Sequence, residues 1–225
     1  LPQWHNLGMT RDTPPEISII IPTLNEAKAV PALIDSLTAQ RGIRSQIIVA
    51  DGGSTDGTRE YTEGQNQLYL VNSPPGRGAQ MNAGAAAASA DWLLFIHADS
   101  LISDPSALRQ ALDQITPDKA GHFSLRFYDR PSKSKTYAAL EEKTKLTREN
   151  TSNGDQGLLI QRKLFEQSGQ FSTRWHFLED QILNEHLRKQ GKLMRLSGTI
   201  HTSARRFESE GFRPRYYLMT LLMTA

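Results

Sequence analysis

Several features are missing from the sequence, and each absence narrows the class of protein. The 225 residues include no cysteine, which excludes disulfide bridges and thiolate metal sites. No apolar run of about 18 residues occurs, so we predict no membrane-spanning helix. The 26 basic and 24 acidic residues give a net charge of only +2, which does not favour nucleic acid as a partner. The hydrophobic content of 38% is instead typical of a folded globular protein.

Short apolar runs alternate with helix-forming segments in the first 100 residues. We predict buried strands over residues 17–21, 46–50, 68–71 and 92–96. Helices are predicted between them, from an apolar face over residues 29–37 and a strongly helix-forming run over residues 79–90. Thr23 or Asn25 is expected to cap the first helix, and Ser54 or Thr55 another one. This alternation predicts an α/β fold whose mostly parallel sheet carries helices on both faces.

The second half of the sequence has a less regular pattern. Strands are predicted over residues 121–128 and 158–160, and a helix over residues 136–146. Leu178, Ile182, Leu183 and Leu187 form the apolar face of a further helix that ends at Gly191. No repeat or linker separates the halves, so we expect one domain over residues 1–225.

Polar clusters follow the predicted strands, at residues 22–26, 51–53, 76–78 and 97–99. Ligands of parallel α/β sheets bind at the carboxyl ends of the strands, so these clusters predict a binding site. The Asp99 carboxylate suits Mg²⁺ or Mn²⁺ bound together with phosphates, although loop carboxylates are common at strand ends. Asp51 beside Gly52 can accept hydrogen bonds from a base or ribose. Arg77 suits a phosphate, or is a solvated loop arginine.

Three other nucleotide or metal motifs are excluded or weakly supported. The DGGSTDG string resembles a calcium loop, but Thr62 stands where the loop needs a glutamate. The same string lacks the lysine of a phosphate-binding P-loop. The GRGAQMNAG string does not have the glycine spacing of a dinucleotide fold.

Carboxylates near the start of the last helix are candidates for acid–base chemistry. Glu179 and Asp180 lie in its first turn, where the helix dipole favours the ionised form and so a base ready to accept a proton. They would equally serve as ordinary acids that complement the dipole. His201 is either an imidazole ligand, a phosphate donor or a structural histidine.

Taken in order, five strings resemble the family-2 glycosyltransferases, whose fold is GT-A. They are SIIIPTLNEA (18–27), QIIVADGGSTDGT (46–58), GRGAQMNAGA (76–85), WLLFIHADS (92–100) and FLEDQILNEHLRKQG (177–191). The resemblance implies a nucleotide-sugar-binding half over about residues 15–115 and an acceptor-binding, catalytic half over about residues 116–225. It also implies Mg²⁺ or Mn²⁺ as cofactor.

The resemblance assigns a role to each matching position. Asp51 would contact uracil or ribose, and Arg77 and Gln80 the nucleotide. Asp180 matches the catalytic base of the family's Glu-Asp motif in an inverting reaction. Residues 97–99 match the Asp-x-Asp element, with Asp99 on the metal. His201, outside that element, is our candidate for a second metal ligand. The expected nucleotide-sugar site comprises Pro22, Thr23, Asn25, Glu26, Asp51, Gly52, Arg77, Gln80, His97, Ala98, Asp155, Gln156, Glu179 and Arg205.

Two departures from the family pattern matter. His97 replaces the first aspartate of Asp-x-Asp, so its contact to the nucleotide must differ. The Gln-x-x-Arg-Trp motif of processive synthases is absent, which favours a single hexose transfer to a small or lipid-linked acceptor. The alternatives are a nucleotidyltransferase and a non-catalytic nucleotide-sugar-binding module.

A narrower resemblance rests on SNGDQG (152–157) and HTSARRF (201–207). These strings are similar to a bacterial subgroup labelled arsenosugar-biosynthesis or radical-SAM-associated glycosyltransferases. In that subgroup Asp155 and Gln156 would line the sugar or acceptor pocket, and His201, Arg205 and Arg206 would close over the diphosphate.

The apolar C-terminal segment bears on location and assembly. Residues 216–223 follow several arginines and form either a terminal helix packed on the domain or on a second subunit of a homodimer, or a membrane-surface contact. With no basic and apolar leader visible, we expect a cytoplasmic protein, at most peripheral to the inner membrane face.

Overall fold

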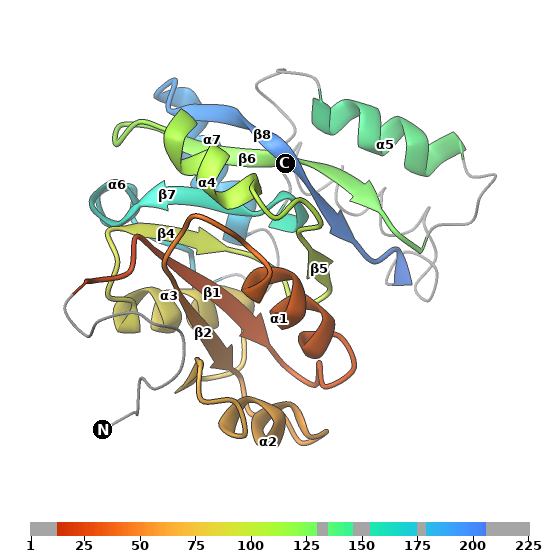
Figure 1. Ribbon diagram of the computed structural model, residues 1–225. Helices are drawn as coiled ribbons and strands as arrows, with labels where there is room; N and C mark the ends of the chain where they lie inside the picture. Colours follow the sequence, from red (N-terminus) through yellow and green to blue (C-terminus); the bar gives the residue numbers. More distant parts are fainter. Residues whose placement is uncertain (1–12, 130–134, 146–153, 175–178, 206–225) are drawn as a thin grey trace.

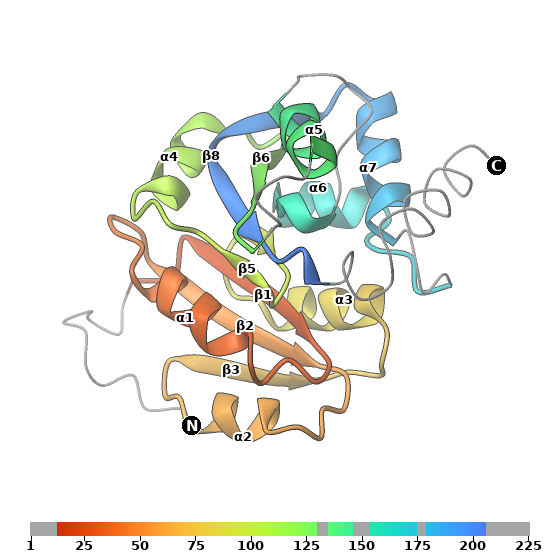
Figure 2. The ribbon, with the colours of Figure 1, turned by 90° about the vertical axis from the view of Figure 1, so that its right-hand side faces the viewer.

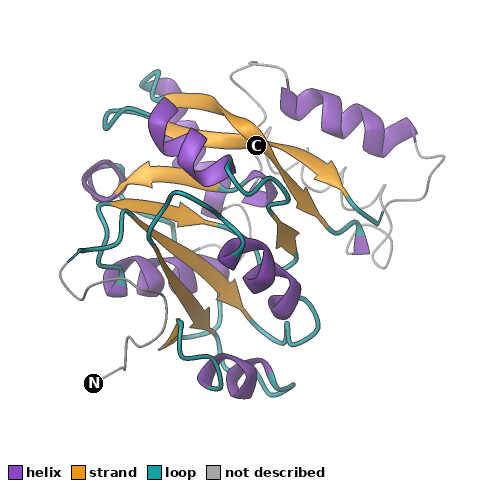
Figure 3. Cartoon of the chain, viewed as in Figure 1, coloured by secondary structure: helices purple, strands orange, loops and turns teal. Residues whose placement is uncertain are grey.

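The computed structural model describes residues 13–129, 135–145, 154–174 and 179–205 (Figure 1). Helices and strands alternate through the first half of these residues and less regularly after β4 (Figure 3). The elements in chain order are β1 (Ile17–Thr23), α1 (Val30–Thr38), β2 (Ser45–Asp51), α2 (Thr58–Glu63), β3 (Leu68–Asn72), α3 (Arg77–Ala87), β4 (Trp92–Phe95), β5 (Ser100–Leu101), α4 (Ala107–Gln114), β6 (Ala120–Phe127), α5 (Lys135–Lys145), the 3₁₀ turn η1 (Gly154–Gln156), β7 (Leu158–Gln161), α6 (Arg162–Gln167), α7 (Glu179–Lys189) and β8 (Leu193–Thr202).

The first four strands form the parallel sheet that the sequence predicts. They lie in the order β3-β2-β1-β4, and all of their pairings are parallel. β1 is buried along its whole length, because its apolar side chains pack against helices on both faces. The register pairs Thr23 with Asp51, so β1 and β2 end side by side. The chain therefore leaves these strands at one rim, where parallel sheets bind ligands.

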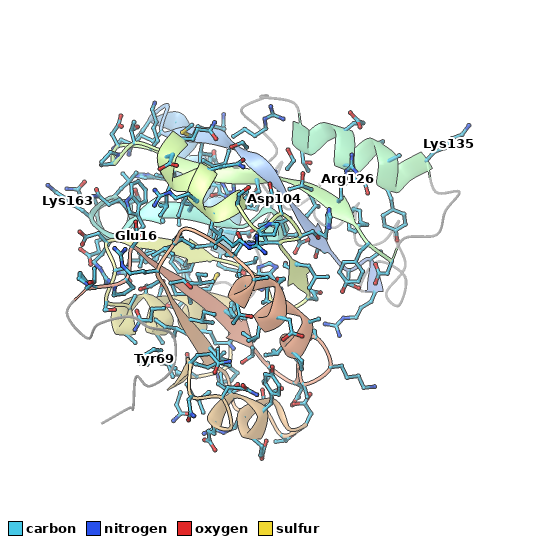
Figure 4. All side chains as sticks on the ribbon, viewed as in Figure 1. Glu16, Tyr69, Asp104, Arg126, Lys135 and Lys163 are labelled. Atoms are coloured by element: carbon cyan, nitrogen blue, oxygen red, sulfur yellow. The ribbon has the colours of Figure 1, made fainter. Side chains whose placement is uncertain are left out.

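From β7 onward the same sheet becomes mixed. β7 runs antiparallel to both β4 and β6, whereas β6 and β8 are parallel. The short β5 pairs antiparallel with β8, and its Ser100 lies opposite Thr202. Within the described residues one eight-stranded sheet, in the order β3-β2-β1-β4-β7-β6-β8-β5, thus joins both halves of the chain. Tyr69 on β3 and Arg126 on β6 lie toward opposite ends of the molecule (Figure 4).

Helices cover both faces of the sheet, as predicted. Figure 2 shows α1 and α4 on one side of the strands and α3, α6 and α7 on the other. Each face has its own core, because successive strand residues point to opposite sides. Ile19 and Ile21 belong to the core with α1 and α4, and Ile20 to the core with α3, α6 and α7. α5 packs over β6 through a smaller cluster that includes Tyr137 and Phe127.

The predicted helix caps are wrong. α1 begins after Ala29 and α2 after Gly57, and neither helix has a side-chain cap. Asn25 instead adopts a positive φ of 57°, and its side-chain oxygen accepts a hydrogen bond from the Thr55 amide at 2.9 Å. Asn25 therefore joins two loops rather than starting a helix, which is a pairing that local sequence does not reveal.

Among the described residues, no helix is long and apolar enough to cross a membrane. Residues 216–223, and with them the predicted membrane or subunit contact, lie outside the part of the chain that the structure describes. Arg206 also lies there.

Candidate active site

Asp51, at the rim of the sheet, is held by several hydrogen bonds. It is 1% exposed, and its Oδ2 accepts hydrogen bonds from the amides of Gly53 and Ser54, both at 2.9 Å. The Ser54 hydroxyl and Thr23 Oγ1 donate to Oδ1, and Arg59 Nη1 lies 3.2 Å from Oδ2. Burial raises the pKa of Asp51, but these hydrogen bonds outweigh burial, and the pKa lies below its ordinary value. Asp51 is therefore a fixed anion.

The loops after β1 and β2 are joined by hydrogen bonds. The amide of Asn25 donates to Ser54 Oγ and the amide of Glu26 to Thr58 Oγ1, both at 2.9 Å. The Ala27 amide donates to Asp56 Oδ2 at 3.0 Å. Each short polar side chain satisfies a backbone group of the opposite loop, which makes the pair of loops rigid. Pro22 is buried where β1 enters this pair of loops.

Gln80 and Gly52 bring α3 against the same loops. Gln80 is 4% exposed, and its Nε2 donates to the carbonyl oxygens of Thr23 at 2.5 Å and Ala50 at 3.0 Å. A Cβ on Gly52 would lie 3.0 Å from Gln80 Nε2 and 3.3 Å from Pro75 Cα. Only glycine fits this close approach without displacing a neighbour. In this structure Gln80 thus supports the predicted nucleotide loops through their backbone.

Asp99 lies opposite Glu26, and an arginine bridges them. Asp99 is 9% exposed, and its Oδ2 lies 3.7 Å from Arg205 Nη2. The same Nη2 donates to Glu26 Oε2 at 2.6 Å. The amide of Ser203 donates to the Asp99 carbonyl at 3.2 Å, which fixes the backbone next to Arg205. The positive guanidinium therefore lies where two buried carboxylates converge.

The residues around Asp99 could supply some, but not all, of the ligands of a divalent ion. Among the described residues, no cluster of three or more His, Asp or Glu side chains could hold a metal by itself. Mg²⁺ and Mn²⁺ commonly use one or two carboxylates and take the remaining ligands from phosphate and water. Asp99 would hold such an ion together with a diphosphate. The carboxylate already attracts a cationic side chain, which is consistent with this chemistry.

His97 and His201, the two predicted histidines, lie in different surroundings. His97 is 8% exposed, and its Nδ1 lies 2.8 Å from Asp155 Oδ1. His201 Nδ1 lies 2.9 Å from Ser103 Oγ on β5's side of the sheet. Burial lowers the pKa of His201, and the nearby Arg126 lowers it further, so its ring is neutral at neutral pH. Its role as a metal ligand stays a prediction.

Other predicted residues surround His97. Ala98 is buried between His97 and Asp99. Gln156 is 3% exposed, and its amide donates to the Phe123 carbonyl at 2.9 Å, so it supports β6. Their predicted contacts to a sugar or nucleotide stay predictions.

Glu179 and Asp180, at the start of α7, differ in environment. Glu179 is 1% exposed and forms an ion pair with Arg77 at 3.4 Å. Burial raises the pKa of Glu179, and neighbouring Asp180 adds to this, whereas Arg77 lowers it. The net pKa is raised, so burial outweighs the stabilisation of the ionised form that the helix dipole is expected to give. Arg77, predicted on the nucleotide, pairs with Glu179 here.

Asp180 faces a pocket in the second half of the sheet. In this structure the pocket is small, with room for about one water molecule. Because His97 lines it too, the predicted base and the Asp-x-Asp position share one site. Its lining residues come from α3, β4, β6, β7, α7 and adjoining loops: Met81, Phe95, His97, His122, Leu158, Phe171, Asp180 and Asn184.

The sequence analysis did not predict some of the residues at the rim and in the pocket. Arg59 and Thr58 lie within the DGGSTDGT stretch, where hydroxyl and charged residues after a glycine turn were the available signal. No sequence pattern indicated His122 or Asn184. They lie on different elements, β6 and α7, which only the folded chain brings to one pocket.

Two solved structures have a similar fold. The chain matches S. aureus TarS 1-349 with a TM-score of 0.68 at 20% identity, over 84% of this chain and 60% of that chain. It matches glucosyl-3-phosphoglycerate synthase from Mycobacterium tuberculosis with a TM-score of 0.64 at 20% identity, over 98% of this chain and 86% of that chain. The fold is therefore that of the GT-A class.

The sequence also shows the family of the chain, which is a more specific assignment than the fold. Residues 18–183 match glycosyl transferase family 2, and the chain belongs to that family. It is 35% identical over 100 residues to a PGL/p-HBAD biosynthesis glycosyltransferase of Mycobacterium tuberculosis, which covers 42% of this chain and 39% of the relative. It is 36% identical over 105 residues to succinoglycan biosynthesis protein ExoA of Rhizobium meliloti, over 43% of this chain and 32% of the relative. The chain thus spans less than half the length of these curated relatives.

Proposed function

We propose that the protein transfers a hexose, with inversion, from a UDP-sugar to a hydroxyl of a small or lipid-linked acceptor. One observation carries this proposal. Asp51, the Glu26–Arg205–Asp99 bridge, His97 and Asp180 follow one another along a single rim. From one end of the rim to the other, these residues would hold the base and ribose, then the diphosphate, and then the reacting sugar carbon.

Asp51 would hold the nucleoside. A fixed, buried carboxylate accepts hydrogen bonds from uracil N–H or ribose hydroxyls without reorganising. Two solved neighbours support uridine: the glucosyl-3-phosphoglycerate synthase structure contains UDP and Mn²⁺, and a TarS structure contains UDP-GlcNAc. The proposed UDP-sugar donor rests on that analogy and on the residues along the rim.

Asp180 would act as general base. It accepts the proton of the acceptor hydroxyl while that oxygen attacks the anomeric carbon, and the bond from this carbon to the phosphate oxygen breaks. The nucleoside diphosphate leaves with the bonding electron pair, and attack from the opposite face inverts the anomeric centre. Arg205, beside Asp99, would neutralise the departing diphosphate, and Arg77, which pairs with Glu179, would add to this. A divalent ion held by Asp99 would supply Lewis-acid stabilisation of the same charge.

The remaining assignments belong to the same proposal. The chain divides near residue 115 into a donor-binding half and an acceptor-binding half. The strings around Asp155 and His201 support membership of the arsenosugar or radical-SAM-associated subgroup. A cytoplasmic location, with residues 216–223 contacting either a second subunit or the membrane surface, accompanies these assignments.

The proposal is tested by comparing nucleotide binding with turnover. Thermal shifts with UDP-, GDP- and dTDP-sugars, with and without Mn²⁺, identify the donor, because a ligand that binds only the folded state raises Tm. Asp180→Asn should keep UDP binding and reduce UDP release from the UDP-sugar by at least about 100-fold. Glu185→Gln, an exposed change on the same helix, is the control. Wild-type turnover by Asp180→Asn would exclude Asp180 as the base.

A further inference from the structure

The strands β6 and β8 end side by side at the rim that carries the candidate site (Figure 1). They pair in parallel, and the register places Phe127 opposite Thr202, so the chain leaves both strands at the same edge. The pairing extends one residue further, because the Tyr128 amide donates to the Thr202 carbonyl at 3.2 Å. Two short segments therefore meet just beyond the strands: residues 128–129 after β6 and residues 203–205 after β8.

Asp129 holds the segment after β8 through its side chain. Its Oδ1 accepts a hydrogen bond from the Ala204 amide at 2.5 Å, and its Oδ2 accepts one from the Ser203 hydroxyl. The Ser203 oxygen in turn accepts a hydrogen bond from the Arg205 amide at 3.1 Å. Ala204 is completely buried, so its amide would be costly to leave without an acceptor. One carboxylate thus anchors residues 203–205, either directly or through Ser203.

Arg205 is the residue that this anchored segment presents to the site. Its Nη2 donates to Glu26 Oε2 at 2.6 Å and lies 3.7 Å from Asp99 Oδ2. The guanidinium stands at the end of a long, partly exposed side chain, so its position depends on where the backbone holds the Arg205 Cα. An arginine on an ordered backbone binds a diphosphate at a lower entropic cost than one on a loop that has to become ordered first.

We propose that Asp129 is a positioning residue for Arg205, which it holds at the diphosphate position through Ser203 and Ala204. The inference rests on the proposed function, because that proposal places the diphosphate of the donor beside Arg205 and Asp99. Asp129 acts on the diphosphate only through Arg205. A negative charge near a diphosphate disfavours its binding, so the charge of Asp129 and its positioning effect change the affinity in opposite directions. The sign of the measured change therefore distinguishes them.

Three variants separate the hydrogen bonds of Asp129 from its charge. Asp129→Ala removes both, whereas Asp129→Asn removes only the charge, because its amide oxygen can accept from the Ala204 amide and its NH₂ group can donate to Ser203 Oγ. Ser203→Ala keeps the charge and cuts the link between Asp129 and the Arg205 amide. Asp118→Ala is the matched control, since it removes an exposed aspartate that accepts a hydroxyl hydrogen bond near the opposite end of β6. Thermal unfolding without ligand establishes that each variant is folded.

The measurement compares a ligand that has the diphosphate with one that lacks it. In the presence of Mn²⁺, calorimetry gives Kd for UDP, and NMR titration gives Kd for uridine. Asp129→Ala should weaken UDP by about three- to tenfold and leave uridine unchanged within about twofold, because the hydrogen bonds that hold Asp51 do not involve Asp129. Ser203→Ala should weaken UDP in the same direction. Asp129→Asn should bind UDP at least as tightly as wild type, and Asp118→Ala should bind it as tightly as wild type.

A double-mutant cycle shows whether Asp129 acts through Arg205. Arg205→Ala alone should weaken UDP, and adding Asp129→Ala in that background should then change Kd by less than about twofold. Equal losses in both backgrounds would mean that Asp129 acts independently of Arg205 and would overturn the inference. The inference would also be overturned if Asp129→Ala bound UDP as tightly as wild type, if it lost uridine as strongly as UDP, or if Asp129→Asn lost as much affinity as Asp129→Ala.

The proposed function and this inference fail in different ways. GDP and dTDP are titrated beside UDP, each with its nucleoside, so that a preference for another base does not hide binding of the diphosphate. Wild type that prefers GDP or dTDP would reject the UDP donor, and the role of Asp129 is then decided with that nucleotide. Wild type that binds none of the three, or Arg205→Ala that binds like wild type, would reject both the diphosphate position and the role of Asp129. A loss in Arg205→Ala without a loss in Asp129→Ala would reject only the inference.

Discussion

Asp51 and Glu179 are both buried carboxylates at the rim, yet their surroundings shift their pKa values in opposite directions. Asp51 receives hydrogen bonds from two amides and a hydroxyl of its own loop, which stabilise its ionised form. Glu179 Oε1 has no hydrogen-bond partner among the described residues and only a longer ion pair with Arg77. Burial alone therefore does not determine the charge of a site residue; the number of donors that the backbone supplies does.

The raised pKa of Glu179 makes its charge destabilising at neutral pH. A carboxyl whose pKa is higher when folded than when unfolded stabilises the fold fully below about 4.5, and this contribution is lost as pH rises through the folded pKa. Glu179→Gln should therefore raise the free energy of unfolding at pH 7.5 by about 1 kcal/mol, because a neutral amide replaces a buried charge and Arg77 remains partly solvated. Urea unfolding at pH 7.5 and pH 4 measures this.

The same comparison contains its control. At pH 4 the gain should disappear, since wild-type Glu179 is then protonated. Glu185→Gln, exposed on the same helix, should change the free energy of unfolding by less than about 0.5 kcal/mol at pH 7.5. A loss of stability in Glu179→Gln at pH 7.5 would mean that the ion pair with Arg77 outweighs burial.

α3 is the element that joins the donor-side loops to the rest of the site. Its first turn approaches the loop after α6 so closely that a Cβ on Gly78 would lie 2.5 Å from the Ser172 carbonyl oxygen. Two residues later Gln80 bonds the ends of β1 and β2, and near the end of the helix Gly84 packs on Ile20. Small residues at these contacts let the helix lie close to β1, so the position of Arg77 depends on packing along the whole helix.

Gly84→Ala tests this close packing. Alanine normally stabilises a helix interior relative to glycine by about 1 kcal/mol. Here a Cβ would overlap the Ile20 side chain, so we expect a net loss of about 1–3 kcal/mol in the free energy of unfolding. The double variant Ile20→Ala/Gly84→Ala should lose less than the sum of the single variants, because the overlap is removed. Simple additivity in urea unfolding would show that the two residues do not clash.

At the scale of the whole molecule, Arg205 joins the first loop of the sheet to the loop after β4. It follows β8, and its guanidinium reaches Glu26 after β1 and Asp99 after β4. Its side chain is 44% exposed, so the ion pairs are partly screened and contribute about 0–1 kcal/mol each to stability. The bridge therefore contributes more to the charge of the site than to the stability of the fold.

Arg205→Ala should separate these two contributions. Without ligand, Tm should change by only a few degrees, because the lost ion pairs are weak. With saturating UDP and Mn²⁺, the rise in Tm should be clearly smaller than in wild type, since one diphosphate-neutralising charge is gone. Arg188→Ala, a partly exposed arginine on α7, should keep the full rise. A full ligand-induced rise in Arg205→Ala would exclude Arg205 from the diphosphate position.

The sequence by itself determined the parallel part of the fold and the polar clusters at its rim. Strands such as β1 are recognisable because continuous burial requires an unbroken apolar run, and the clusters follow from where those runs end. The order of five strings was enough to indicate the family, which the match over residues 18–183 confirms. These are local features, and local sequence records them.

Only the tertiary structure decided the rest of the site. β8 alternates poorly because its neighbours, β6 and β5, bury it unevenly, and its pairing with β6 shifts register near His122. The Glu26–Arg205–Asp99 bridge joins residues up to 179 positions apart, and the pocket brings His122 to Asn184. Such contacts depend on which strands become neighbours, which is set by the packing of whole elements rather than by the residues around each position.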